Sequence, residues 1–357
     1  MHDVAIAGGG PAGLAAAIRA AQRGFRTVLF ERSHAVPDKA CGEGLMPSGA
    51  RELERLGIRI AQDRCAPFRG IRYLQEDGTV LEARFGTESG IGIRRTALGE
   101  ALRDRALASG VDLRHGTVTG ATALPGCVEL RTDAGAAEAR LLIAADGLHS
   151  PLRRAAGLDL PQPGRAPVRY GIRRHFALPP WTDFVEVHWA EGVEAYVTPV
   201  GPRSVNVAFL REGETKDRFE ELLGRFPSLR ERIGDAGAAS EVRGAGPLLQ
   251  RVRARAGERL ALIGDAAGYV DAITGQGLSL AFAASAVLME ALPDDLSTDL
   301  RPALQRYEAG VRARWLRYAL PAHALVALSR RPGLRRSALR SIARFPLAFG
   351  VVVRIVE

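Results

Sequence analysis

The chain has 357 residues, of which 46% are hydrophobic and 25% are charged, a composition typical of a globular protein with ample core. Its formal net charge is +9, and arginine supplies the excess because lysine occurs only at Lys39 and Lys216. No helix-turn-helix, zinc-finger or RNA-recognition motif accompanies this charge, so we expect no nucleic-acid partner. No apolar run approaches about 18 residues and the first strand follows Met1 directly, so we expect neither a membrane span nor a signal peptide. The three cysteines are odd in number and lack metal-ligand spacing, which indicates a reducing cytoplasm and no metal site.

Residues 3–31 have the pattern of a strand, a glycine turn, a helix and a second strand. Gly8 allows the tight turn, Gly10 lets the backbone approach a pyrophosphate, and Gly13 lets the helix pack closely on the strand. Free N–H groups at the start of the helix, which opens with Pro11 and Ala12, would hold the phosphates. The pattern therefore predicts a site for the ADP half of a dinucleotide.

The acid that ends the second strand completes this site. Glu31 follows Gly8 by 23 residues, a spacing suited to a carboxylate that accepts hydrogen bonds from ribose hydroxyls. A 2′-phosphate would be repelled by this carboxylate, so NADP is disfavoured at this position.

Further elements follow in chain order. We expect a glycine-punctuated loop at 38–49, a helix at 50–56, antiparallel strands within 68–94, a helix at 94–108, and strands at 111–119, 128–132 and 141–145. A proline-rich crossover at 161–167 leads to a second set of alternating strands at 168–210, then a strand at 259–263, a helix at 277–291 and C-terminal helices from about residue 300.

These elements indicate an α/β fold with a Rossmann-type domain and an inserted antiparallel sheet. We expect a discontinuous cofactor domain at 1–64, 92–164 and 255–300, a substrate domain at 65–91 and 165–254, and a C-terminal helical segment at 301–357.

Two later motifs narrow the class. A predicted strand ends in Asp146-Gly147, and another delivers Asp265 just before a Gly-x-Gly sequence, Gly275 to Gly277, that opens a helix. Together with the first turn and in this order, they resemble FAD-dependent oxidoreductases of the para-hydroxybenzoate hydroxylase and geranylgeranyl reductase superfamily, over about residues 1–300.

The resemblance implies non-covalent FAD, with NADH or NADPH as a transient reductant. It implies that Asp265 binds the ribityl chain, that Arg95 lies near the phosphates or the ribityl chain, and that the backbone of Val118 touches adenine. Gly275 and Gly277 would face the flavin edge where negative charge collects on reduction. The predicted cofactor contacts are Gly8, Gly10, Pro11, Ala12, Gly13, Glu31, Arg32, Cys41, Gly42, Arg95, Val118, Asp146, Asp265, Gly275, Gly277 and Leu278.

Several reactions use this type of scaffold. A halogenase needs a reactive lysine and a tryptophan motif, but the corresponding segment, 194–199, contains no tryptophan. A non-catalytic flavin sensor is disfavoured by the intact Gly-x-Gly turn. A monooxygenase acting through a flavin C4a-hydroperoxide and a reductase of isoprenoid double bonds remain open.

Resemblance to subgroups favours the monooxygenase. Residues 38–47, 246–250 and 268–275 are similar to bacterial monooxygenases associated with polyketide-derived phenolic lipids, which implies a lipophilic phenol as substrate. The Cys41-Gly42 loop, however, resembles the Cys-Gly loop of prenyl reductases, where a thiol could relay a proton. The catalytic candidates are Cys41, and His188 and Tyr196 on the second sheet, which could orient or deprotonate a phenol.

The second sheet is also expected to supply an apolar pocket over the flavin. Seven aromatic residues are candidates for its lining, namely Phe68, Phe85, Phe176, Trp181, Trp189, Tyr196 and Phe209.

The C-terminus is strongly basic, since residues 329–357 hold seven arginines against one acid, Glu357. On a helix from Leu334, one face carries Leu334, Ala338, Ile342 and Phe345, and the opposite face carries Arg336, Arg340 and Arg344. Such a helix suits peripheral contact with an anionic membrane, and the alternative is a helix docked on the body with its arginines in water.

Overall fold

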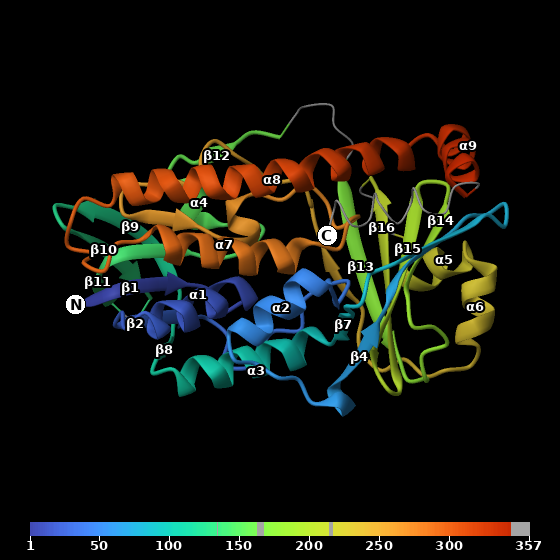
Figure 1. Cartoon of the computed structure of the whole chain (residues 1–357), viewed down its shortest axis with the longest axis horizontal. Coiled ribbons are helices and arrows are strands. Elements are labelled where there is room, and N and C mark those ends of the chain that lie inside the picture. The colour runs from blue at the N-terminus through green and yellow to red at the C-terminus, as the bar shows by residue number, and fades with distance from the viewer. Residues whose placement is uncertain (134, 163–167, 214–216, 344–357) are drawn as a thin grey trace.

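The computed structural model describes residues 1–133, 135–162, 168–213 and 217–343. Two large sheets lie at opposite ends of an elongated molecule, and one long helix, α8 (Arg301–Ser329), runs along both of them (Figure 1). The α/β fold with a parallel sheet and a second antiparallel sheet confirms the predicted fold class.

The first sheet has the strand order β19-β20-β11-β1-β2-β8, with β10 and β9 added beside β11. Strand β1 pairs in parallel with both β2 and β11, which places it at the centre. The strands are β1 (His2–Ala7), β2 (Thr27–Glu31), β8 (Asp112–His115), β9 (Val118–Leu124), β10 (Cys127–Thr132), β11 (Gly135–Ala144), β19 (Ala256–Gly257) and β20 (Leu260–Leu262).

Alternation along β1 gives this sheet two buried faces. Val4 and Ile6 join a core formed with several helices, whereas Ala5 and Ala7 join a second core on the opposite face. These helices include α1 (Pro11–Gln22), α3 (Arg95–Ala108), α7 (Gly277–Ala291) and part of α8. The carboxyl ends of the central strands are thereby left beside the N-terminus of α1.

The second sheet has seven strands in the order β17-β13-β16-β15-β14-β5-β6. Helices α5 and α6 cover one face, and α8 with α9 covers the other (Figure 1). These elements are β5 (Gly70–Leu74), β6 (Val80–Arg84), β13 (Arg169–Phe176), β14 (Val185–Ala190), β15 (Val193–Gly201), β16 (Ser204–Glu212), β17 (Arg243–Ala245), α5 (Phe219–Gly224), α6 (Pro227–Ile233) and α9 (Pro332–Ala343).

Small elements connect the two sheets. Strands β3, β7 and β4 form a three-stranded sheet between them, and β12 pairs with β18. The remaining bounds are β3 (Gly44–Leu45), α2 (Pro47–Arg55), β4 (Cys65–Phe68), β7 (Gly90–Ile93), α4 (Pro151–Ala155), β12 (Asp159–Leu160) and β18 (Arg251–Val252), with short 3-10 turns at Gln62–Arg64 and Gly264–Ala267.

One predicted strand was wrong in its extent. The single strand expected at 111–119 is two strands, β8 and β9, because the chain turns at Gly116, whose φ is +155°. Strand β8 pairs in parallel with β2, whereas β9 pairs antiparallel with β10. The helix expected at 277–291 has these bounds in the structure.

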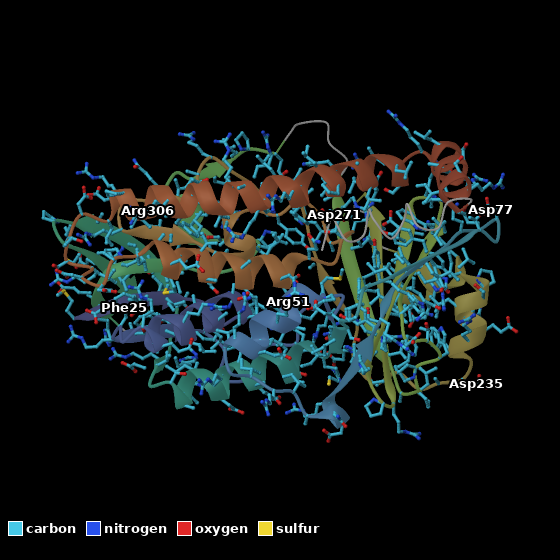
Figure 2. The ribbon with its side chains drawn as sticks, viewed as in Figure 1. Phe25, Arg51, Asp77, Asp235, Asp271 and Arg306 are labelled. Atoms are coloured by element: carbon cyan, nitrogen blue, oxygen red, sulfur yellow. The ribbon has the colours of Figure 1, made fainter. Side chains whose placement is uncertain are left out.

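The C-terminal helix α9 is docked on the second sheet rather than lying free. Its predicted apolar face is wrong in part, because Leu334 is 54% exposed whereas Arg335 is fully buried. Arg335 stacks over Trp189 and donates two hydrogen bonds of 3.0 Å to the Glu76 carboxylate. Figure 2 shows Asp77, the partner of Arg340, beside this helix. Arg344, Phe345 and Glu357 lie outside the described residues.

No helix in the described ranges has both the length and the apolar character needed to cross a bilayer.

Candidate functional site

The first glycine turn leaves no room for side chains on its inner side. Gly8 has a φ of +107°, and a Cβ there would lie 2.4 Å from the carbonyl oxygen of Ala145. A Cβ at Gly13 would lie 1.9 Å from the Gly8 carbonyl oxygen, far inside van der Waals contact. At Gly10, by contrast, a Cβ would meet only the guanidinium of Arg95, at 3.6 Å. The turn is therefore closed toward the protein and open at the N-terminus of α1.

Glu31 holds this turn in place. Its Oε2 accepts a 2.6 Å hydrogen bond from the Gly9 backbone N–H, and its Oε1 accepts one of 2.9 Å from that of Ser33. A carboxylate has about four acceptor positions. Glu31 can thus shape the turn and still accept bonds from ribose hydroxyls.

Positive charge collects where the turn opens. Arg95 is buried, which lowers its pKa, although the carboxylates of Asp265 and Glu43 nearby favour its charged form. Burial and the charges of Arg95 and Arg32 lower the pKa of Lys39. Together with the helix N-terminus, these cations suit a pyrophosphate. The prediction omitted Lys39, although its place two residues before Cys41 in a chain with two lysines was a usable signal.

Asp265 lies beside this cationic group. Burial raises the pKa of its carboxyl group, and Arg95, Lys39 and Arg153 oppose that shift. Buried Arg153 fixes the turn by donating hydrogen bonds to the carbonyls of Asp265 (3.4 Å) and Ala266 (3.2 Å). Arg153 is a positioning residue that the sequence prediction missed.

The Gly-x-Gly turn adjoins the same place. Gly275 has a φ of +67°, and no atom lies within 4 Å of a Cβ built there. The Thr274 hydroxyl is buried without a hydrogen-bond partner in the described part of the chain. Gly277 begins α7, with Leu278 following it. The backbone at Gly275 is open, and the Thr274 hydroxyl can donate a hydrogen bond. Both features suit contact with the polar edge of a ring that carries hydrogen-bond acceptors.

Other predicted contacts have structural roles as well. Asp146 caps α4, since its Oδ2 accepts a 3.1 Å bond from the Leu152 N–H, while its Oδ1 is buried without a partner among the described residues. Val118 begins β9 and is buried against the first sheet. Arg32 is exposed. Nothing in the structure tests their contacts with a cofactor, which stay predictions.

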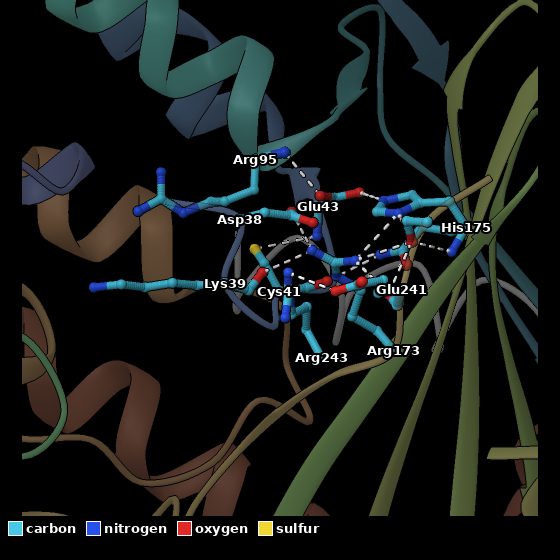
Figure 3. A network of polar contacts seen from close by, with 11 residues as sticks. Asp38, Lys39, Cys41, Glu43, Arg95, Arg173, His175, Glu241 and Arg243 are labelled. Atoms are coloured by element: carbon cyan, nitrogen blue, oxygen red, sulfur yellow. Dashed lines mark hydrogen bonds and ion pairs between the residues drawn. The ribbon is translucent and has the colours of Figure 1, made fainter. Parts of the chain in front are cut away.

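A buried polar network ties the Cys41 loop to the second sheet (Figure 3). The Glu43 carboxylate lies 2.5 Å from His175 Nε2 and also accepts a 2.7 Å bond from the Arg95 backbone N–H. Arg173 binds the Asp38 carboxylate, and Asn206 Nδ2 donates a 2.9 Å bond to the Cys41 carbonyl. Residues of one sheet therefore hold a loop that lies at the end of the other.

The Cys41 thiol is placed among charged groups of the candidate site. Its sulfur accepts a 3.3 Å bond from the Glu43 N–H. Burial raises the pKa of the thiol, the Glu43 carboxylate raises it further, and Arg95 opposes both effects. The thiol therefore keeps its proton at neutral pH, which disfavours a role as nucleophile.

The structure does not bring His188 and Tyr196 together. Val187, not His188, is the cross-strand neighbour of Tyr196, so His188 points to the opposite face of the sheet. There it lies 3.1 Å from Glu186, against Phe226. A role for His188 on a substrate shared with Tyr196 is wrong for this reason.

Tyr196 contacts the loop before the Gly275 turn. Its hydroxyl donates a 3.3 Å hydrogen bond to the Ile273 carbonyl, two residues before Gly275. Burial and the neighbouring Glu194 raise its pKa well above the usual value, so the phenol stays protonated. Figure 2 shows Asp271, which starts the same loop, between the two sheets. Arg169 pairs with both Asp271 (2.9 Å) and Glu194 (2.7 Å).

The seven aromatic residues predicted for one pocket also divide between two faces. Those that face α8 and α9 are Phe68, Phe85, Trp189 and Tyr196. Those packed against α5 and α6 are Phe176, Trp181 and Phe209. Only the first group lies on the face of the sheet that meets the loop before Gly275.

The residues present fit FAD. Helix N–H groups and Arg95 suit its pyrophosphate, Glu31 and Asp265 suit its ribose and ribityl hydroxyls, and the Thr274 hydroxyl is unpaired beside the open Gly275. Within the described ranges, no group of His, Cys, Asp and Glu side chains could hold a metal ion.

Denaturation should release FAD, because no histidine or cysteine lies in a recognised attachment motif. Acid precipitation of the yellow holoprotein should leave flavin absorbance in the supernatant. Colour that stays with the washed precipitate would contradict the non-covalent assignment.

Comparison with known proteins agrees with this site. Residues 1–315 match the family described as FAD binding domain. The chain is 28% identical over 338 residues to a digeranylgeranylglycerophospholipid reductase of Methanosarcina acetivorans, covering 88% of this chain and 80% of that protein. It is 30% identical over 304 residues to a menaquinone reductase of Mycolicibacterium smegmatis, covering 77% of this chain and 72% of that protein.

Solved structures show the same fold at low sequence identity. A flavoprotein/dehydrogenase from Cytophaga hutchinsonii has a TM-score of 0.83 at 18% identity, covering 99% of this chain and 92% of that one. The halogenase PltM in complex with phloroglucinol and FAD has a TM-score of 0.75 at 18% identity, covering 96% of this chain and 85% of that one. From its family match and its relatives, the chain belongs to the FAD binding domain family and is an FAD-dependent oxidoreductase of the para-hydroxybenzoate hydroxylase and geranylgeranyl reductase superfamily.

Proposed function

We propose that this enzyme reduces isolated double bonds in the isoprenoid chain of a lipid. The sequence favoured hydroxylation of a phenolic lipid and kept this reduction as the alternative. Two observations favour reduction: the two relatives matched by sequence are reductases, and the candidate site holds the Cys41 thiol, whereas neither of the predicted bases, His188 and Tyr196, is placed to accept a phenolic proton.

The Cys41 thiol carries this proposal. Reduction of a carbon–carbon double bond adds a hydride to one carbon and a proton to the other. When bound, FAD supplies the hydride, which it receives from NADH or NADPH. Cys41 donates the proton and regains one from solvent, which its partial exposure allows.

The neighbouring residues bind and orient. Arg95 and the N-terminus of α1 hold the phosphates, Asp265 holds the ribityl chain, and Glu43 fixes the loop that carries Cys41. The apolar cluster on the α8 side of the second sheet, which includes Tyr73, Trp189 and Leu210, excludes water from the substrate.

Phenol hydroxylation has weaker support from this geometry. It needs a group that accepts the phenolic proton. Tyr196 has a raised pKa and is bound to a backbone carbonyl, and His188 lies on the far face of the sheet.

Product mass distinguishes the two reactions. Anaerobic holoenzyme with excess NADH or NADPH should convert a geranylgeranyl lipid to products heavier by two hydrogens per double bond. An alkylresorcinol under labelled oxygen should gain no oxygen atom. Oxygen-dependent labelling of the resorcinol, with the prenyl lipid unchanged, would establish the hydroxylase instead.

Substitution of Cys41 tests the proton donor. Cys41→Ala should slow reduction by about 100-fold or more, as expected for loss of a general acid, with FAD content unchanged. The matched control is Cys127→Ser, since Cys127 lies on β10, away from the turn. Equal turnover of Cys41→Ala and wild-type enzyme would exclude the thiol from the reaction.

A further inference from the structure

We propose that the outer face of α8, around Leu316 and Leu320, docks the enzyme on an anionic membrane surface. The proposal rests on the proposed function, because an isoprenoid lipid must be collected from a bilayer. It differs from the sequence-based expectation, which assigned this contact to residues 329–357.

Exposed leucines mark the face. Leu320 is 68% exposed and Leu316 is 49% exposed. The two residues are one helical turn apart, so their side chains lie on the same side of α8. Leu334 at the start of α9 is 54% exposed as well. Scattered surface leucines are ordinary, but a pair in register on a basic helix is typical of interfacial binding.

Arginines surround this pair without acids among them. Residues 309–343 contain eight arginines and neither aspartate nor glutamate. Among the described residues, no carboxylate pairs with Arg312, Arg317 or Arg331. The arginines are therefore available to lipid phosphates or carboxylates, while the leucines can enter the headgroup region.

Helix α9 is less suited to this contact than α8. Its Arg335 and Arg340 are paired with Glu76 and Asp77 in the turn between β5 and β6. Residue Leu339 is buried in the same interface. These residues of α9 already contact the body of the protein and are not available to a membrane. We therefore assign the lipid contact to α8.

The inner side of the same turns reaches the flavin site. Trp315 and Tyr318 line a small cavity, of about 30 Å³, together with Asp265, Tyr269 and Gly277. The Tyr318 hydroxyl also donates a 2.7 Å bond to the Asp271 carbonyl, in the loop before Gly275. Figure 1 shows α8 running along one long side of the molecule. Docking through Leu316 and Leu320 thus brings the bilayer within one helix diameter of the cofactor turn.

A lipid surface fits this face better than a nucleic acid. A phosphodiester backbone could pair with the arginines but offers no apolar partner for two exposed leucines. An anionic bilayer offers phosphate groups to the arginines and acyl chains to the leucines.

Vesicle flotation of the FAD-loaded, full-length enzyme tests the proposal. Vesicles of phosphatidylcholine with about one-third phosphatidylglycerol should bind the enzyme, with weaker binding in high salt and on pure phosphatidylcholine. Leu316→Ser with Leu320→Ser should lower the partition coefficient at least about tenfold. Arg312→Gln with Arg317→Gln should lower it about twentyfold.

Matched controls come from other elements. Leu107 on α3 is 50% exposed, so Leu107→Ser should leave vesicle binding unchanged. Arg59→Gln with Arg203→Gln removes the same charge elsewhere and should have a small effect. Absence of wild-type binding, equal loss in the control variants, or a dimer in light scattering that the leucine substitutions dissolve would overturn the proposal. Because flotation needs no turnover, its result is independent of the reductase assay.

Discussion

Gly13→Ala should abolish FAD binding. The added Cβ would lie 1.9 Å from the Gly8 carbonyl oxygen, a backbone atom that cannot move without opening the turn. We expect destabilisation of about 3 kcal/mol or more, at the upper end of overpacking effects. Because the N–H groups that face the pyrophosphate move with the turn, FAD affinity should fall at least about 100-fold. Fluorescence titration of apoprotein with FAD measures the affinity, and urea unfolding measures the loss of stability.

Gly224→Ala is the control for this substitution. Gly224 ends α5, and no atom lies within 4 Å of a Cβ built there. Alanine is favoured over glycine in a helix by about 0.5–1 kcal/mol, so this variant should be unchanged or slightly more stable. Stoichiometric FAD in purified Gly13→Ala would show that the phosphates bind elsewhere.

The cofactor half of the fold could be predicted because its residue requirements are local. A positive φ at Gly8 and a close approach at Gly13 demand glycine whatever the rest of the chain does. The strand, turn and helix of residues 2–22 are likewise determined by neighbouring residues. Family, fold class and FAD are confirmed for this reason.

The second sheet could not be predicted to the same degree. Alternation shows which residues share a face, but all nine residues of β15 are buried, Glu194 and Thr198 included, so both faces are covered by other elements. Nothing in the pattern then shows which face meets the Gly275 turn, so His188 and Tyr196 were both proposed as catalytic although they lie on opposite faces. The burial of Arg335 could not be predicted for a related reason, since its partners Glu76 and Trp189 are distant from it in sequence.

Glu43→Ala should destabilise the enzyme more than any single surface charge change. Glu43 and His175 are almost fully buried, with 1% and 0% of their surfaces exposed. Removing one partner of a buried pair costs about 3–5 kcal/mol, because the other is left without compensation. FAD affinity should fall as well, since the Glu43 carboxylate also holds the Arg95 backbone. Glu43→Gln keeps an acceptor for that N–H and should lose less.

Glu241→Gln provides the comparison within the same region. Glu241 is exposed and pairs with Arg243 at 2.9 Å (Figure 3), so its loss should change the unfolding free energy by less than about 1 kcal/mol. Equal effects of Glu43→Ala and Glu241→Gln would contradict the role of the buried pair.

A double-mutant cycle separates the pair from the other contact of Glu43. The Glu43 carboxylate also accepts the Arg95 backbone bond, which Glu43→Ala removes whether or not His175 is present. That loss cancels when Glu43→Ala is compared in wild-type and His175→Ala proteins. A coupling of more than about 1 kcal/mol in urea unfolding would show that the pair itself joins the Cys41 loop to the second sheet. A coupling near zero would mean that loss of the Arg95 bond explains the single variant, and that the loop is positioned by Arg173 and Asn206 instead.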